Sequence, residues 1–390
     1  MPLKINIQPG RERRLLGGHL WAFSNEIQSI EGEGKPGDLA ELYASGRFLG
    51  TAFYNPNSLI AARLVSREKE DVDAGFFRRK LAEAKAFRER MIPGETSYRL
   101  CFGESDGLPG LVIDRYGDVL ALQVLSAGIE VRLDALAAAL KELFEPRCIF
   151  LKNDHRARTL EGLPIETRVL DGGLPEKATI SENGLRFAAL VGEGQKTGHY
   201  FDQRENRAFL RPFFKDRVVL DLYSYTGAFA VNAAKFGAKS VLAIDSSGPA
   251  IEAGRENARL NGVEVEFDEA DAEAVLASFA GGKQPFKPDM ILLDPPSFVP
   301  SKKHLPKALR TYMKLNAQAL KALPKSGLLA TSTCSHHVGR EEFFEMLRAS
   351  VIKAQRPARL LALRGQGLDH PVLMTMPETE YLHFALIEVL

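Results

Sequence analysis

The sequence predicts an α/β protein whose largest domain, residues 183–390, is a doubly wound parallel sheet. Apolar strand segments alternate there with helical segments at lengths typical of that fold. The expected strands of this sheet are 218–222, 240–245, 265–267, 290–294 and 327–332. The last segment, 381–389, is expected to add an antiparallel edge strand.

Two smaller domains are expected before this sheet. Residues 1–70 read as a small β domain, because short extended runs at 3–7, 39–43, 48–54 and 60–65 are separated by glycine- and proline-rich turns. Residues 71–182 read as an α+β domain. Its expected elements are a helix at 74–90, a hairpin at 111–125, a helix at about 130–144 and a strand at 148–152.

Composition excludes several classes of function. The chain has 390 residues, a formal net charge of +1 and 26% charged residues, so any nucleic-acid surface must be a local patch. Three widely spaced cysteines argue against a disulfide framework or a zinc site, and we expect no metal. The start of the chain lacks the pattern of a signal peptide, and we find no apolar run long enough to span a membrane. The prediction is a cytoplasmic protein.

A local basic patch occurs near the amino terminus. Its cationic residues are Lys4, Arg11, Arg13 and Arg14, and aromatic residues follow at Trp21 and Phe23. Such a patch could hold RNA through phosphate contacts and stacking. A solvated charged turn beside a core tryptophan explains the same residues equally well.

The ends of the first three strands of the large sheet carry carboxylates. Asp221 ends the first strand, Asp245 ends the second, and Asp271 follows the third. The loop after the first strand contains Tyr223, Ser224, Thr226 and Gly227, but no full Gly-x-Gly-x-x-Gly run for a dinucleotide pyrophosphate. We therefore predict a site for S-adenosylmethionine, although each acid could instead cap a helix.

The fourth strand leads into the segment Asp294-Pro-Pro-Ser-Phe298. Two prolines restrict the backbone, so that Asp294 could hydrogen-bond a planar base while Phe298 stacks near it. The alternative is a rigid loop with a structural aspartate. Lys302 and Lys303 follow and could receive phosphates, although lysines on an exposed loop are more often simply solvated.

Cys334 ends the fifth strand of the sheet. Carbon 5 of cytosine is a poor nucleophile, and a thiolate that adds at carbon 6 creates an enamine able to attack a methyl donor. A lone cysteine is more often a small buried hydrophobic residue. The position of Cys334 at a strand end favours a nucleophile. Of the next residues, His336 and His337, at most one is expected to assist, because their side chains point opposite ways in extended chain.

These residues resemble the RlmI-type family of bacterial large-subunit ribosomal RNA cytosine-C5 methyltransferases over nearly the whole chain. The matching stretches are 15–23, 103–110, 195–204, 223–227, 294–298, 334–335 and 369–371. The resemblance implies a PUA domain, an RRM-like α+β domain and a Rossmann-like class I methyltransferase domain. It also implies S-adenosylmethionine as cofactor, Gln203 as a further cofactor-binding residue, Cys334 and Asp294 as catalytic residues, and 23S ribosomal RNA as substrate.

Two departures from the family pattern leave alternatives open. Asp221-Leu-Tyr replaces an Asn-Cys-Phe-like start, and His336-His337 stands where other members carry small residues. The rivals are a ribosomal RNA guanine N-methyltransferase with a structural Cys334 and a non-catalytic RNA-binding ribosome assembly factor. The sequence does not decide the target nucleotide, the base that removes the C5 proton, naked RNA versus a subunit or assembly intermediate, or the oligomeric state, for which a homodimer is one option.

Overall fold

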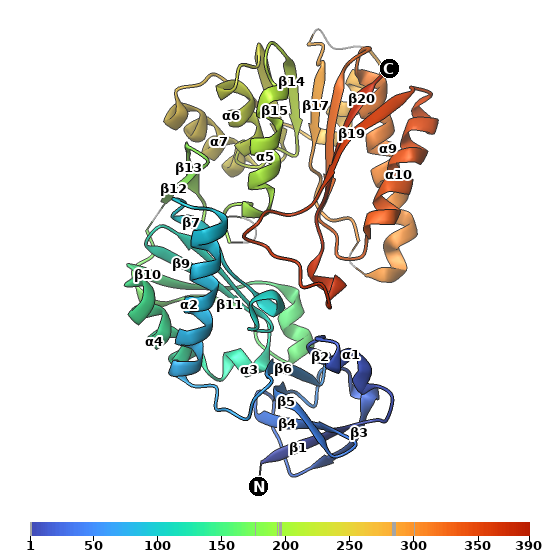
Figure 1. The fold of residues 1–390 in the computed structure, drawn as a ribbon. Helices are drawn as coiled ribbons and strands as arrows, with labels where there is room; N and C mark the ends of the chain where they lie inside the picture. Colours follow the sequence, from blue (N-terminus) through green and yellow to red (C-terminus); the bar gives the residue numbers. More distant parts are fainter. Residues whose placement is uncertain (1, 176, 193, 195–196, 283–285, 300) are drawn as a thin grey trace. The chain divides into compact units, whose positions relative to one another are not determined.

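The computed structural model describes residues 2–175, 177–192, 194, 197–282, 286–299 and 301–390 (Figure 1). The chain forms two compact units. The first comprises Met1–Ile180, Ala189–Phe201 and Leu368–Thr379, and the second comprises Ser181–Ala188, Asp202–Gly367 and Glu380–Leu390. The segment 368–379 therefore belongs to the first unit although it comes late in the sequence.

A six-stranded sheet opens the first unit. Its strands in spatial order are β2 (Trp21–Ala22), β6 (Ala62–Ser66), β5 (Arg47–Tyr54), β4 (Leu39–Ala44), β1 (Leu3–Ile7) and β3 (Ile27–Glu31). The pair β1 and β4 is parallel and the other pairs are antiparallel. Alternate apolar residues on these strands point inward, and Ile5, Leu42 and Leu64 are almost fully buried. One short helix, α1 (Glu12–Leu16), follows β1.

A mixed five-stranded sheet and its helices complete the first unit. The strands in spatial order are β11 (Glu166–Gly172), β10 (Cys148–Asn153), β9 (Val119–Val124), β8 (Leu111–Tyr116) and β7 (Ser97–Phe102). The helices are α2 (Ala74–Met91), α3 (Ala127–Glu130) and α4 (Leu133–Phe144). Phe77 and Leu81 of α2 and Leu136 of α4 share one buried cluster with the sheet residues Leu122 and Ile149. Residues 103–106 form a 3₁₀ turn.

The second unit contains a seven-stranded sheet. Its strands in spatial order are β16 (Glu266–Glu269), β15 (Ser240–Asp245), β14 (Val218–Leu222), β17 (Met290–Leu293), β18 (Leu328–Thr333), β20 (His383–Val389) and β19 (Ala358–Arg364). The first five strands are parallel to one another, as the sequence predicts. The terminal strand β20 is antiparallel as expected, but its predicted place at the edge is wrong. It pairs with β18 on one side and with β19 on the other.

Helices connect the strands, which makes the sheet doubly wound. They are α6 (Ala228–Lys235), α7 (Gly248–Asn261), α8 (Ala272–Ala280), α9 (Leu305–Ala322) and α10 (Arg340–Ala354), and α5 (Arg204–Leu210) precedes the first strand, β14. The helix α6 packs against α5 and α7, whereas α9 packs against α8 and α10. In such a sheet the carboxyl ends of parallel strands meet at one edge, where ligands bind. A separate two-stranded ribbon joins β12 (Ala178–Glu182) to β13 (Leu185–Ala189).

Candidate active site

Polar residues lie at or just after the carboxyl ends of all five parallel strands. Asp221 is the fourth residue of β14, Asp245 is the last residue of β15, and Asp271 follows β16. Asp294 and Cys334 come directly after β17 and β18. The register aligns these ends, since Leu293 of β17 pairs with Leu222 of β14 and with Thr331 of β18. The structure thus brings the predicted acids and the predicted nucleophile to one edge of one sheet.

The loop after β14 has an unusual backbone. Tyr223, Tyr225 and Gly227 have φ angles of +61°, +50° and +72°. A Cβ atom on Gly227 would lie 2.7 Å from the ring of Phe267, so both the backbone angle and the space require glycine there. The amide of Tyr225 donates to Asp245 Oδ2 over 2.8 Å. Asp245, one of the three predicted cofactor-site acids, therefore holds the first loop in place.

Two buried polar atoms in this loop point to a bound ligand. Asp221 Oδ2 and Ser224 Oγ have no hydrogen-bond partner among the described residues, and both side chains are buried. Buried polar groups are nearly always paired in native proteins, so unpaired ones beside a strained loop mark a ligand site. Burial, and then the charge of Asp294, raise the pKa of Asp221 well above its usual range. These features fit the S-adenosylmethionine site that the sequence predicts.

The remaining predicted cofactor residues have different surroundings. Asp271 is the N-cap of α8, and its Oδ1 accepts from the amide of Ala274, so the capping role raised as an alternative is present. Burial and the charges of Glu273 and Asp271 raise the pKa of Tyr223 to about 12. Thr226 is buried in the loop. Gln203 lies beside Asp294, to which its Nε2 donates over 3.1 Å.

The loop after β17 is held by a residue that the sequence analysis missed. Tyr312 of α9 donates its hydroxyl to the carbonyl of Pro296 and accepts from the amide of Phe298, both over 3.2 Å. The rings of Phe298 and Tyr312 lie 4.9 Å apart. Burial raises the pKa of Tyr312 to about 12, so the hydroxyl stays protonated and can donate. No local sequence pattern marks Tyr312, because its partners lie in the preceding loop, 14 and 16 residues earlier in the chain.

Cys334 is the partly exposed cysteine of the three. Cys101 and Cys148 are buried in the first unit, and burial raises the pKa of both thiols. Both therefore behave as inert packing residues. The structure thus leaves Cys334 as the thiol accessible to a substrate.

The exposed His336 ring lies 5.0 Å from that of Tyr381, whose hydroxyl donates to Asp202 over 2.6 Å.

Some side chains of the predicted cationic patches pair within the fold, whereas others are exposed to solvent. Arg14 is engaged within the first unit, where it donates to both carboxylate oxygens of Glu26 over 2.8 and 2.9 Å. Arg11 and Arg13 are exposed, as are Lys302 and Lys303 in a 3₁₀ turn of the second unit. The ammonium of Lys4 lies 5.8 Å from the ring centroid of Tyr43. Trp21 is half-buried and donates to Glu104 over 2.8 Å.

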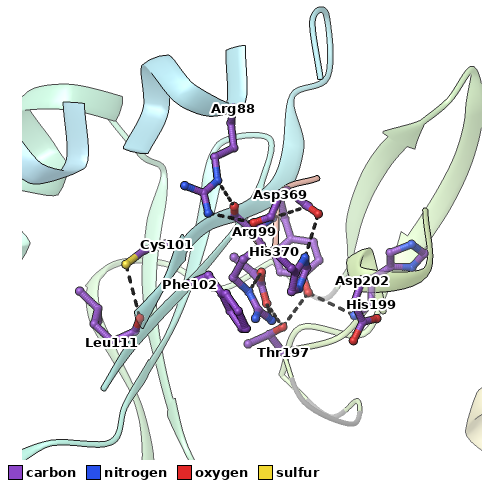
Figure 2. A network of polar contacts seen from close by, with 12 residues as sticks. Arg88, Arg99, Cys101, Phe102, Leu111, Thr197, His199, Asp202, Asp369 and His370 are labelled. Atoms are coloured by element: carbon purple, nitrogen blue, oxygen red, sulfur yellow. Dashed lines mark hydrogen bonds and ion pairs between the residues drawn. The ribbon is translucent and has the colours of Figure 1, made fainter. Parts of the chain in front are cut away.

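The stretch 369–371 lies in a buried polar network of the first unit (Figure 2). Asp369 Oδ2 accepts from the amide of Arg99 over 2.9 Å, and Asp369 Oδ1 lies 2.8 Å from His370 Nδ1. Arg88 donates to the carbonyl of Asp369 over 2.8 Å and also pairs with Asp106. The network fixes a late segment of the chain onto β7 and α2. The stretch 195–204 also matches the family pattern, and its residues 195 and 196 lie outside the described residues.

Comparisons with known proteins define the class. Residues 5–67 match the PUA-like domain family, and residues 131–345 match the S-adenosylmethionine-dependent methyltransferase family. Two solved structures share the fold over 100% of both chains. One is described as a SAM-dependent methyltransferase from Streptococcus mutans, with a TM-score of 0.85 and 24% identity. The other, SMU.776, is described as a methyltransferase complexed with SAH, with a TM-score of 0.86 and 23% identity. The protein is a class I S-adenosylmethionine-dependent methyltransferase with a PUA-like domain.

Full-length relatives give the family. Ribosomal RNA large subunit methyltransferase I from Aeromonas salmonicida is 39% identical over 390 residues, which cover 98% of each chain. The protein of that name from Pseudoalteromonas atlantica is 37% identical over 397 residues, which cover 100% of each chain. The chain therefore belongs to the ribosomal RNA large subunit methyltransferase I family. The predicted family, fold class and cofactor are confirmed.

Among the described residues, the structure contains no helix long and apolar enough to cross a membrane. Nor do the residues described here include a group of three or more histidine, cysteine, aspartate or glutamate side chains placed to hold a metal ion.

Proposed function

We propose that this protein transfers a methyl group from S-adenosylmethionine to carbon 5 of a cytosine in large-subunit ribosomal RNA, with Cys334 as the nucleophile. The observation that carries the proposal is the placement of a partly exposed thiol and of Asp294 after neighbouring parallel strands, at the sheet edge that also holds the cofactor loop. The names of the full-length relatives support ribosomal RNA as the substrate class. Such a substrate also agrees with the predicted cytoplasmic localisation.

In this mechanism the thiolate of Cys334 adds to carbon 6 of the cytosine, and the ring electrons shift to carbon 5. S-adenosylmethionine supplies a methyl group made electrophilic by its sulfonium. Carbon 5 takes this methyl, and the cofactor is left as the neutral thioether S-adenosylhomocysteine. A base then removes the proton from carbon 5, and the sulfur of Cys334 leaves carbon 6 as thiolate. Asp294 accepts a hydrogen bond from the base edge, and the ring of Phe298 supports the base. Water is the simplest proton acceptor, since no other base is assigned.

The same proposal assigns the surrounding residues. The S-adenosylmethionine site is formed by Asp221, Tyr223, Ser224, Thr226, Gly227, Asp245 and Asp271, with Asp294 at its border. The predicted RNA contacts are Lys302 and Lys303 beside the site and Lys4, Arg11 and Arg13 in the PUA-like domain. A target base that is stacked in RNA must be unstacked at a cost of about a few kcal/mol, which contacts with flanking RNA offset.

The direct test replaces the thiol. Cys334→Ala should lose transfer of labelled methyl to unmodified large-subunit ribosomal RNA, whereas Cys148→Ala should retain it because Cys148 is buried in the other unit. RNA with 5-fluorocytosine should trap the unaltered protein covalently and should not trap Cys334→Ala. Full activity of Cys334→Ala, or methyl found on guanine, would favour a guanine N-methyltransferase with a structural Cys334. Absence of transfer by the unaltered protein to any RNA would favour an assembly factor.

A further inference from the structure

A chain of hydrogen-bonded side chains leads from β19, the outermost strand of the seven-stranded sheet, to Asp294. Arg364, the last residue of β19, donates its Nε to Asn206 Oδ1 over 3.1 Å. Asn206 in α5 donates its Nδ2 to Gln203 Oε1 over 2.7 Å. Gln203 then donates its Nε2 to Asp294 Oδ2 over 3.1 Å and to Ser332 Oγ over 3.2 Å. The hydroxyl of Ser332 donates to the other carboxylate oxygen of Asp294.

The guanidinium of Arg364 fixes the direction of every bond in this chain. Arginine has only donors, so the oxygen of Asn206 must face it and the amide nitrogen of Asn206 must face Gln203. The oxygen of Gln203 therefore turns toward Asn206, and its two N–H groups turn toward Asp294 and Ser332. Because Ser332 Oγ accepts one of them, its own proton is directed to Asp294. With these donors and acceptors, the side-chain amides of Asn206 and Gln203 each have a single orientation.

Burial makes these orientations costly to reverse. Gln203, Asn206 and Ser332 are each 1% or 2% exposed. A buried amide that is turned around would place oxygen against oxygen and would leave N–H groups unpaired. Nδ2 of Asn206 also donates to the carbonyl of Gly365 over 3.1 Å, which holds that side chain from a second direction.

We propose that Arg364, Asn206 and Gln203 form a positioning relay that fixes Asp294 as a hydrogen-bond acceptor toward the target base. This inference rests on the proposed function of Asp294. A carboxylate that accepts one N–H and one O–H from fixed neighbours keeps both its orientation and its role as acceptor. It suits the donor that cytosine presents, which is the exocyclic amine. Other ionisable groups near Asp294 are Asp221 from β14 and Tyr312 from α9, and the thiol of Cys334 after β18 lies near Tyr312.

The relay gives Gln203 a role different from the predicted one. Both N–H groups of Gln203 are engaged by Asp294 and Ser332, and its oxygen accepts from Asn206. Gln203 thus has no N–H group left to donate to a cofactor, and its oxygen is directed at Asn206. Gln203 therefore acts through Asp294, as a positioning residue.

The sharpest test changes Asn206, which is connected to Asp294 through Gln203. Asn206→Asp keeps the size and the oxygen that faces Arg364, but it removes the donor to Gln203, whose amide must then turn its oxygen toward Asp294. Asn232→Asp is a matched control, because Asn232 is equally buried, accepts from Arg211 Nε over 3.2 Å and donates to the carbonyl of Ala228 over 2.9 Å. The probes are large-subunit ribosomal RNA for steady-state transfer and S-adenosylhomocysteine for binding.

We expect kcat of Asn206→Asp to fall by about 10- to 100-fold, since small misplacements of a reacting group cost that much. Its affinity for S-adenosylhomocysteine and its KM for RNA should stay within about twofold, and Asn232→Asp should keep its kcat. The relay is overturned if Asn206→Asp keeps its kcat, or if its kcat and its affinity for S-adenosylhomocysteine fall together. The latter result would make Gln203 a cofactor ligand.

A second variant covers the case in which Asn206→Asp does not fold. Ser332→Ala removes the O–H donor of Asp294, and Ser350→Ala is its control, because the buried Ser350 donates to the carbonyl of Met346 over 2.7 Å within α10. Ser332→Ala should lose kcat and Ser350→Ala should keep it; equal kcat values overturn the relay. In the same assay, methylation of cytosine by the unaltered protein tests the proposed function independently of the relay.

Discussion

At the scale of one residue, the buried carboxylate of Asp221 in the predicted cofactor site lowers the stability of the folded chain when it is ionised. Its carboxylate is buried, one oxygen has no partner among the described residues, and the nearby charge of Asp294 opposes its ionisation. A folded-state pKa above the unfolded one means that the folded chain binds this proton more tightly. Ionising Asp221 therefore costs stability. The cost begins above the unfolded pKa of about 3.9, grows until the pH passes the folded pKa, and stays constant above it.

Asp221→Asn should therefore raise the melting temperature, and the gain should be larger at pH 8 than at pH 5. The amide has a similar shape and no charge to bury. Asp268→Asn in the exposed part of β16 should change the melting temperature little at either pH. Thermal unfolding at both pH values checks this, and titration with S-adenosylhomocysteine should show weaker binding by Asp221→Asn. A lower melting temperature at pH 8 would show that the ionised carboxylate has a stabilising partner.

At the scale of an element, the loop 294–298 depends on both its own sequence and a neighbouring helix. The two prolines restrict its backbone, which the sequence predicts. Its position in space, however, is set by the hydroxyl of Tyr312, which bonds to the backbone of Pro296 and Phe298. A rigid loop held at two points keeps Asp294 and Phe298 in place before substrate arrives.

Tyr312→Phe removes both hydrogen bonds and keeps the ring that packs on Phe298. We expect kcat to fall by about 10-fold, with a loss of about 1–2 kcal/mol in stability, because the Phe298 amide and the Pro296 carbonyl lose their partner. S-adenosylhomocysteine binding should be unchanged. Tyr98→Phe is the control, since the buried Tyr98 accepts from Arg115 over 3.1 Å in the first unit. An unchanged kcat for Tyr312→Phe would show that the prolines alone position the loop.

The elements that the sequence predicts well are those defined by local pattern. Four of the five parallel strands, β14, β15, β17 and β18, contain a run of apolar residues, and a polar residue lies at or directly after the end of each, so these strands and the acids at their ends can be read directly. The fifth, β16, has the single apolar residue Phe267 and is the least marked of the five. Long-range pairing is different. The sequence does not predict β19, whose residues are largely exposed or half-buried, and without it the inner position of β20 could not be predicted. Ser332, Asn206 and Arg364 were missed for the same reason, because hydrogen bonds made only in the folded chain define them.

At the scale of the whole molecule, charge is balanced and RNA binding must depend on local patches. The net charge of +1 provides little long-range attraction for a polyanion. Among the predicted phosphate ligands, Arg11 and Arg13 are exposed, whereas Arg14 already pairs with Glu26. The structure therefore separates a cation that supports the fold from cations that are accessible to phosphate.

The accessible cations should determine how RNA affinity depends on salt concentration. Each phosphate contact contributes about 0.7–0.9 to the slope of log affinity against log salt concentration. Arg11→Ala with Arg13→Ala should weaken binding of large-subunit ribosomal RNA fragments at low salt and reduce the slope by about 1.4–1.8. Lys302→Ala with Lys303→Ala should act in the same way. Arg14→Ala should instead lower the melting temperature and leave the slope nearly unchanged, because it breaks the pair with Glu26.

Lys325→Ala with Lys353→Ala is the matched control, since both lysines are exposed and lie outside the predicted patches. Filter binding or fluorescence anisotropy across a salt series measures all four slopes. If the slope for either predicted pair equals that of the control, that pair makes no phosphate contact and the RNA must be held elsewhere. A reduced slope for both pairs would mean that cations of the PUA-like domain and of the methyltransferase domain both contact RNA phosphates, so that local patches supply the attraction that the net charge of +1 does not.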